Sequence, residues 1–202
     1  ATVKIEVNGT KRGIIGDTVD MSLCAKAKDE FNMGCKARTV SFTQLYGGKI
    51  TAALSRQHPR DLFDCKYMDI SSFEDVKDGF MLCLLGSDKP IIESLQPNEI
   101  DQTDALEKQF EGMSDIAFSY EDYKQARLQL VKLVQEGMTK ADKDFLLSFE
   151  EGCPDWGLCS AGDLSKYPSV QWKLLNIRNL KEHNIQKHEQ GIKKLKDFLF
   201  PK

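Results

Sequence analysis

Residues 45–64 read LYGGKITAALSRQHPRDLFD, and this stretch says more about fold and function than any other part of the 202-residue chain. Its apolar residues form one stripe at helical spacing, made of Tyr46, Ile50, Ala53 and Leu54. This periodicity predicts a helix from Gln44 to about Gln57, with Thr43 as its N-cap. Proline disfavours helix at the residue before it but is favoured in a first turn, so Pro59 is predicted to end this helix and begin another.

The charged residues of the same stretch are spaced so that they share helix faces. Lys49 and Arg56 are seven residues apart, close to two helical turns, and should project from one side. Two cations on one helix face can bind a polyanion such as a triphosphate. Asp61 and Asp64 share a face of the following helix, and Arg60 is four residues before Asp64, which allows an ion pair.

Each of these spacings also has a purely structural interpretation. A Lys/Arg pair on a helix is more often a solvated face than a binding site. Asp61 would be favoured by the helix dipole in a first turn. Asp64 with Arg60 would be an intrahelical salt bridge of a few tenths of a kcal/mol. Spacing alone therefore leaves the two interpretations open.

Strand patterns are confined to the first part of the chain. Val3, Ile5 and Val7 alternate with polar residues, which predicts a half-buried strand with Glu6 on its polar face. The other predictions there are a turn at Asn8-Gly9, a return strand at Lys11–Ile15, a helix at Thr18–Phe31 and a strand at Ala37–Phe42. After about Ser71 the predicted elements are all helices: Phe73–Leu85, Asp101–Phe110, Tyr120–Glu136, Lys140–Phe149, Ser169–Lys181 and Ile185–Phe200. The fold class is therefore α+β.

The composition is that of an ordinary soluble globular protein, with 41% hydrophobic and 29% charged residues. A net charge of −3 provides no global attraction for nucleic acid or membrane, so a nucleic-acid partner would need a local basic patch. The six cysteines contain no C-x-x-C pair and the three histidines are not at ligand spacing, so we expect reduced, mostly buried thiols and no zinc site. With no signal-peptide pattern and no membrane-spanning run, we expect a cytoplasmic protein.

The segments GGKITAALSR (residues 47–56) and RDLFD (residues 60–64) are similar to a motif of the AbiEii/AbiGii toxin nucleotidyltransferases, K-x-x-A-x-x-x-R followed by R-D-x-x-D. The likeness extends to Lys4–Val7, the Trp156 loop and Gln171–Leu174. It implies a partial polymerase-β-like nucleotidyltransferase sheet followed by a mostly helical C-terminal domain. Residues 1–70 would be the C-terminal part of the nucleotidyltransferase domain, and residues 71–202 the helical domain.

The resemblance also implies a function. Members of this family are toxins of toxin–antitoxin pairs, some in abortive phage defence, and use a nucleoside triphosphate, with tRNA as the acceptor in some relatives. Lys49 would then bind the triphosphate, and Asp64 together with Asp61 would complete the active site or activate the acceptor. Arg56 and Arg60 would position phosphates or hold those carboxylates.

Nucleotidyl transfer concentrates negative charge on phosphate, which Mg²⁺ ions held by carboxylates offset. Glu6 is a candidate metal ligand and catalytic carboxylate, and its alternative interpretation is an exposed strand glutamate. The family carries a Gly-rich segment and a D-x-D pair before this strand, whereas only five residues precede Glu6. We therefore expect that this chain alone does not transfer nucleotides.

Two other functions are compatible with the sequence. The chain could be a non-catalytic interaction module from a split or degenerate gene that binds an antitoxin or another protein. An RNA-binding helical protein would need a continuous basic surface along residues 178–196, which the interspersed acids argue against. If the chain is an enzyme, we expect Lys49, Asp64 and Glu6 to converge in one cleft. If it is an interaction module, these residues can be scattered or neutralised by salt bridges. We expect the core to include Trp172, Leu175 and Leu180, and we expect Trp156 to be a packing anchor within its loop.

Overall fold

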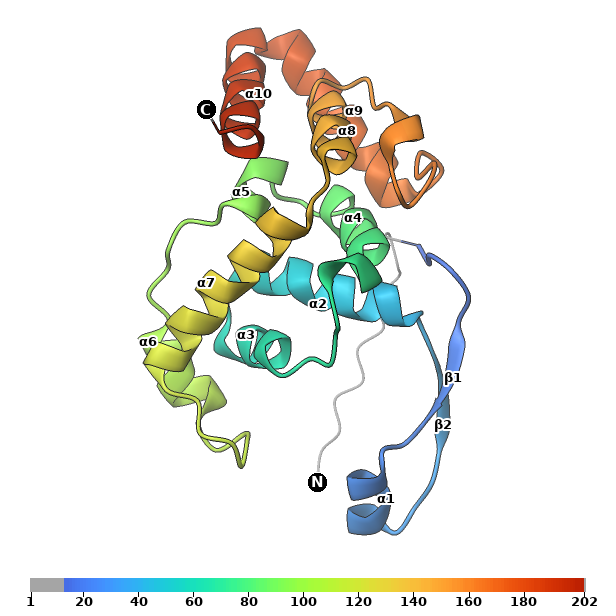
Figure 1. Cartoon of the computed structure of the whole chain (residues 1–202), viewed down its shortest axis with the longest axis vertical. Helices are drawn as coiled ribbons and strands as arrows, with labels where there is room; N and C mark the ends of the chain where they lie inside the picture. Colours follow the sequence, from blue (N-terminus) through green and yellow to red (C-terminus); the bar gives the residue numbers. More distant parts are fainter. Residues whose placement is uncertain (1–12, 202) are drawn as a thin grey trace.

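In the computed structural model, which describes residues 13–201, helix α2 (Phe42–Arg56) lies at the centre of a helical body (Figure 1). The other elements are, in chain order, β1 (Val19–Ser22), α1 (Ala25–Phe31), β2 (Lys36–Thr39), α3 (Pro59–Lys66), η1 (Phe73–Asp75), α4 (Lys77–Leu85), α5 (Ile91–Leu95), α6 (Thr103–Ala105), η2 (Leu106–Phe110), α7 (Tyr120–Gly137), α8 (Lys140–Glu150), η3 (Trp156–Leu158), α9 (Pro168–His183) and α10 (Ile185–Leu199). A small antiparallel sheet followed by helices is an α+β fold, as predicted from the sequence.

Strands β1 and β2 form an arm that extends away from the body and has α1 at its tip (Figure 1). They pair antiparallel from Val19 opposite Thr39 to Ser22 opposite Lys36. The predicted helix at Thr18–Phe31 is therefore wrong in its first half. Its apolar stripe meets no core, since Val19 is 45% and Phe31 66% exposed.

The predicted strand at Ala37–Phe42 is confirmed in type, but β2 is displaced toward the N-terminus. The predicted strand around Val3–Val7, with Glu6, and the turn after it lie outside the described residues. Of the predicted return strand at Lys11–Ile15, residues 13–15 are described, and they form no strand.

Helix α2 begins at Phe42 because Ser41, not Thr43, is its N-cap. The Ser41 hydroxyl accepts a hydrogen bond from the backbone N–H of Gln44 and donates one to the carbonyl of Ile15 at 2.9 Å. Thr43 was a plausible cap from the sequence, but its hydroxyl accepts instead from the backbone N–H of Gly79 at 3.1 Å. Thr43 therefore joins α2 to α4.

Helices α2 and α4 cross with their backbones in direct contact. A Cβ on Gly47 would lie 2.1 Å from the backbone nitrogen of Phe80, and one on Gly79 would lie 2.1 Å from the carbonyl oxygen of Thr43. Both distances are far below van der Waals contact, so each helix needs glycine at the crossing. Helix α4 is buried on almost every side. Its contact with α2 fixes the position of α2, and therefore of the side chains that α2 carries.

The turn between α2 and α3 is held by Gln57, which is 2% exposed and has a left-handed φ of 51°. Its side-chain nitrogen donates to the carbonyl of Asn98 at 2.6 Å, and its side-chain oxygen accepts from Arg127 Nε at 2.8 Å. Its backbone carbonyl accepts from the hydroxyl of Tyr123 at 3.0 Å. The angle between α2 and α3 is therefore set by three bonds to this one residue.

The helices predicted after residue 71 are largely confirmed, with three differences. The segment Asp101–Phe110 begins its helix at Thr103 and is divided into α6 and the π-helical η2. The segment Phe73–Leu85 is divided at Val76 into η1 and α4. Helix α5 was not predicted, because Pro90 looked like a break, whereas it is the N-cap residue of this short helix. No helix within residues 13–201 combines the length and apolarity needed to cross a bilayer.

The expectations for the large apolar side chains of the C-terminal part are met in part. Trp156 packs against Phe145 and Phe149, with ring centroids 5.4 and 6.2 Å apart, as expected for a packing anchor. The core prediction is wrong for Trp172 and Leu175, which are 61% and 48% exposed. The inner side of α9 is instead occupied by other residues, among them Val170, Leu174 and Ile177. No disulfide joins the six cysteines, all of which lie within residues 13–201, and three of them are buried: Cys65, Cys83 and Cys159.

Candidate functional site

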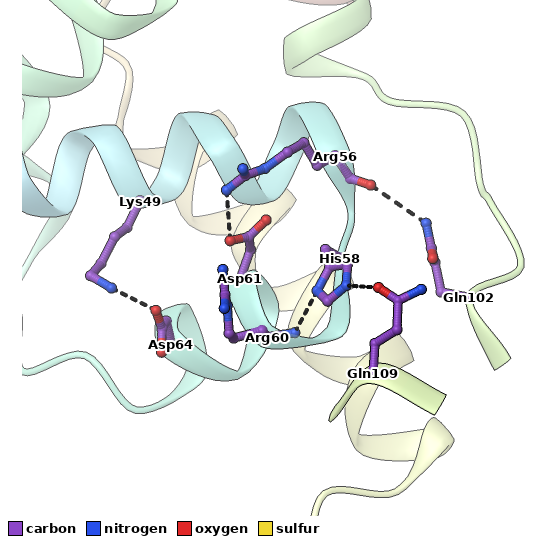
Figure 2. Close-up of polar contacts among 8 residues, drawn as sticks. All are labelled: Lys49, Arg56, His58, Arg60, Asp61, Asp64, Gln102 and Gln109. Carbon is purple, nitrogen blue, oxygen red and sulfur yellow. Dashed lines mark hydrogen bonds and ion pairs between the residues drawn. The ribbon is translucent and has the colours of Figure 1, made fainter. Parts of the chain in front are cut away.

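The charged residues of the motif lie where α2 and α3 run side by side (Figure 2). Lys49 Nζ lies 2.5 Å from Asp64 Oδ2, and the two side chains are 37% and 39% exposed. The helical spacing of α2 directs Lys49 toward α3, and the apolar stripe with Ile50 and Leu54 faces the core. A half-exposed ammonium and carboxylate in contact are accessible to a ligand that can compete for either charge.

A second ion pair connects the same two helices about two turns away. Arg56 Nη2 lies 2.8 Å from Asp61 Oδ1 (Figure 2), and the Asp61 side chain is only 12% exposed. Its other oxygen, Oδ2, is buried without a hydrogen-bond partner among the described residues. The prediction that Lys49 and Arg56 share one helix face, and Asp61 and Asp64 another, is thus confirmed, because all four meet in the α2–α3 seam.

The possible ion pair between Arg60 and Asp64 is not formed, because Asp64 pairs with Lys49. The Arg60 side chain is exposed, and within residues 13–201 no carboxylate pairs with its guanidinium. Its backbone N–H donates to His58 Nδ1 at 3.2 Å, so His58 caps the first turn of α3. Among residues 13–201, Arg60 is therefore a cation without an acidic partner at the N-terminal end of α3.

Beside these residues lies an open cavity of about 400 Å³. It is lined by Arg56, His58, Arg60, Asp61, Gln109 and Met113. Three of these residues were predicted from the sequence as site residues, whereas His58, Gln109 and Met113 were not. The position of His58 directly before Pro59 was the one available signal, because that is an N-cap position. No spacing rule connects residue 109 to residue 58.

A larger cavity of about 670 Å³ lies between α5, α7 and α10, lined by residues such as Ile92, Met138 and Phe198. None of the predicted site residues that lie within residues 13–201 lines it. We therefore assign the candidate site to the smaller cavity and the adjoining α2–α3 seam, where the charged residues of the motif are found.

The thiol next to the seam is not a nucleophile. The pKa of Cys65 is raised to about 12, mainly by burial and also by the nearby carboxylates of Asp64 and Asp61, while Lys49 opposes the shift. The thiolate fraction at neutral pH is then negligible, and only a thiolate attacks efficiently. Chemistry at this site has to come from the carboxylates and cations.

A divalent metal is implied by the resemblance, but the described residues do not fit one by themselves. Within residues 13–201, no three His, Cys, Asp or Glu side chains come together as a ligand set. Asp61 and Asp64 are each paired with a cation. Glu6, the predicted metal ligand, lies outside the described residues.

Three of the C-terminal cations have partners within the protein. Arg178 Nε donates to the carbonyl of Gly152 at 3.2 Å, and Lys181 Nζ donates to that of Glu151 at 3.3 Å. Lys193 is paired with Asp197 at 2.9 Å. These side chains are engaged within the protein, which argues against the RNA-binding helical protein.

Comparison with known proteins gives one match to a family. A family model described as nucleotidyl transferase AbiEii toxin, type IV toxin–antitoxin system, matches residues 1–174. No curated protein and no solved structure matches the chain. The matched segment includes α2, α3 and every residue that lines the smaller cavity.

Proposed function

The chain belongs to the AbiEii family of nucleotidyltransferase toxins of type IV toxin–antitoxin systems, and we propose that its α2–α3 seam binds the phosphates of a nucleoside triphosphate. The nucleotide would be transferred to an acceptor, for which we propose an RNA such as tRNA. Both substrates belong to the cytoplasm, where we propose that the toxin acts, in a phage-defence role.

The observation that carries this proposal is the contact between Lys49 and Asp64 at 2.5 Å, in a position open to solvent. Both groups remain close to water, so neither is a buried structural charge. A triphosphate offers an ammonium group several anionic oxygens in place of one carboxylate. When Lys49 turns to a phosphate, the Asp64 carboxylate is released as a free base.

The proposed reaction is an attack of the acceptor on the nucleotide. The acceptor oxygen attacks the α-phosphorus, its new bond forms as the bond to the β-phosphate breaks, and pyrophosphate leaves. The proton of the acceptor hydroxyl passes to the Asp64 carboxylate, which acts as a general base. Asp61, held by Arg56, positions that guanidinium toward the phosphates.

The proposal is tested by nucleotide binding. In isothermal titration with GTP or CTP and Mg²⁺, we expect weak binding by the whole chain, which Lys49→Ala removes. The matched control is Lys132→Ala on α7, an exposed lysine that is 71% accessible and remote from the motif. Binding that Lys49→Ala leaves unchanged would contradict the proposal. Tight Mg²⁺-dependent binding would show that the chain holds a metal ion more strongly than the ligands among residues 13–201 allow.

A second candidate function is a non-catalytic interaction module that binds the antitoxin of its pair. The observation in its favour is that both motif acids, Asp61 and Asp64, are already neutralised by cations of α2. Size-exclusion chromatography with the antitoxin separates the candidates. A module forms the complex with no detectable nucleotide binding, and Lys49→Ala does not change the complex.

A further inference from the structure

The imidazole of His58 has a single arrangement of protons that satisfies its neighbours. Its Nδ1 accepts the backbone N–H of Arg60 at 3.2 Å, so the neutral ring carries its proton on Nε2. Nε2 lies 3.1 Å from Gln109 Oε1 and therefore donates to it (Figure 2). The atom of Gln109 that faces His58 must be its oxygen, because a second donor there would leave the bond unmade.

The carboxamide of Gln109 is thereby oriented as a donor. Its oxygen is used by His58, and its nitrogen, on the other side of the group, has no hydrogen-bond partner within residues 13–201. Gln109 lines the cavity together with Arg60, whose guanidinium also has no partner in this part of the chain. Two side chains that lack partners thus offer only N–H groups, which require a ligand rich in acceptors.

The charges that line the cavity also favour an anionic ligand. Arg56 and Asp61 neutralise each other at 2.8 Å, and the free oxygen of Asp61 is buried. Arg60 lines the cavity as a positive charge that no carboxylate of residues 13–201 pairs with. A nucleobase edge usually combines donors and acceptors, whereas a phosphate is anionic and presents acceptors only.

We propose that Gln109 and Arg60 form a phosphate-binding site, and that His58 is a positioning residue that holds the Gln109 carboxamide in its donating orientation. The choice of phosphate as the ligand rests on the proposed nucleotidyl transfer, and the phosphate would belong to one of the two substrates of that reaction. It is either the polyphosphate of the nucleotide or a phosphodiester of the acceptor RNA. Gln109 contributes through a turn of η2, a π-helical segment, and such segments are frequent at functional sites.

The test compares ligand binding by the wild-type protein with ligand binding by the variant Gln109→Glu. A glutamate still accepts from His58, but it presents a negative charge to the ligand where the amide presented N–H groups. The probes are inorganic tripolyphosphate and a short single-stranded RNA with no terminal phosphate, each titrated at low salt. The control is Gln171→Glu on α9, which introduces the same charge on another exposed glutamine.

We expect Gln109→Glu to weaken binding of one probe about tenfold or more, because it replaces a hydrogen bond to a charged group by repulsion. Gln171→Glu should change binding less than about twofold, because Gln171 does not line the cavity and its charge would act on the ligand only through water of high dielectric constant. Loss of tripolyphosphate binding identifies the nucleotide as the source of the phosphate, and loss of RNA binding identifies the acceptor. Equal binding of both probes by wild type and Gln109→Glu would overturn the proposal.

His58→Asn tests the positioning role, since asparagine can still cap α3 but is too short to reach Gln109. We expect an unchanged thermal midpoint, together with loss of the ligand-induced NMR shift of the Gln109 side-chain amide. A shift that persists in His58→Asn would overturn the positioning role. The outcomes are independent of the Lys49 test: if Lys49→Ala has no effect and Gln109→Glu has one, the phosphate site stands and the proposed nucleotide site in the seam fails.

Discussion

The ammonium of Lys49 and the carboxylate of Asp64 come from neighbouring helices and meet at 2.5 Å, with 37% and 39% of their side chains exposed. Exposed ion pairs of this kind contribute about 0–1 kcal/mol to stability. We therefore expect Lys49→Met and Asp64→Asn each to change the free energy of unfolding in urea by less than about 1 kcal/mol. Lys49→Met should nevertheless lose nucleotide binding, whereas Asp64→Asn, which frees the Lys49 ammonium from its partner, should retain it.

The matched pair for this comparison is Lys140 with Asp144 on α8, which meet at 2.6 Å on an exposed surface. Removal of that pair should have an equally small effect on stability and none on nucleotide binding. A large loss of stability in Lys49→Met would instead indicate that the seam is held together by its charges, and that the pair is structural.

The crossing of α2 and α4 provides a prediction with a built-in control. Gly47→Ala places a Cβ 2.1 Å from a backbone nitrogen of α4, so the helices must separate, and we expect destabilisation by about 1–3 kcal/mol or more. At Gly48 the added Cβ meets only the sulfur of Cys83, at an ordinary 3.5 Å. Gly48→Ala should be neutral or stabilising by up to about 1 kcal/mol, because alanine is the better helix former.

Thermal and urea unfolding of the two alanine variants measure this difference directly. If Gly47→Ala were as stable as Gly48→Ala, the close approach of the two helices would be incorrect. The position of Lys49 would then be uncertain too, since it lies on the same turn of α2.

Asp142 stabilises the start of α8 and a buried cation at the same time. Its side chain is 2% exposed and accepts from the backbone N–H and hydroxyl of Thr139 at 2.9 and 2.7 Å. It also lies 3.3 Å from the buried ammonium of Lys77, which is 2.8 Å from Glu74. Asp142→Ala should destabilise the protein by about 3–5 kcal/mol, because a buried ammonium loses a partner.

The control for this variant is Glu74→Gln, since Glu74 is 68% exposed and leaves the contact between Lys77 and Asp142 intact. We expect a loss of less than about 1 kcal/mol for it in urea unfolding. Equal losses for the two variants would contradict the assignment of Asp142 as the main partner.

Lys173 predicts a dependence of stability on pH. Its ammonium is buried between α4 and α9 and donates to the carbonyls of Leu84, Ser87 and Lys89 at 3.1, 3.1 and 2.6 Å. Burial lowers the pKa of Lys173 to about 8, although the charges of Glu150 and Asp88 oppose this. Above pH 8 the folded protein is then neutral at this position, while the unfolded chain keeps its proton up to about pH 10.4.

The unfolded state thus binds more protons in this window, and the contribution of Lys173 to stability rises with pH. We expect the stability of wild type relative to Lys173→Met to increase by up to about 3 kcal/mol between about pH 8 and pH 10. Urea unfolding of both proteins at a series of pH values measures this. The buried thiols with raised pKa values, Cys65 and Cys159, contribute equally to both proteins. A difference that stays constant with pH would show that the ammonium retains its ordinary pKa.

The sequence predicted helix faces well because they follow from local periodicity. The α2 stripe with Ile50 and Leu54 is buried, and the cations opposite it do meet the acids of α3. Local signals failed where a tertiary contact decides. Thr43 has the chemistry of an N-cap, but its hydroxyl binds α4 instead, and Trp172 has the chemistry of a core residue, but α9 turns it toward solvent.

The site was predictable only for residues that lie on α2 and α3. Gln109 and Met113 reach the cavity from a segment that follows some 40 residues after α3, and no periodic pattern connects the two regions. The spacing of four residues suggests Arg60 as the partner of Asp64. The carboxylate instead pairs with Lys49, which is 15 residues distant in the sequence. Pairing across a helix seam requires the crossing geometry, which glycines in α2 and α4 set.

The bonds of Gln57 have a consequence for how a ligand would be received. One buried side chain ties the corner between α2 and α3 to two other parts of the protein, so neither helix can swing without breaking several bonds at once. Ligand entry would then be accommodated by rotation of Lys49 and Arg60 about their own side-chain bonds. Only a small ordering entropy would oppose association, and the backbone of the free and the occupied protein should superimpose.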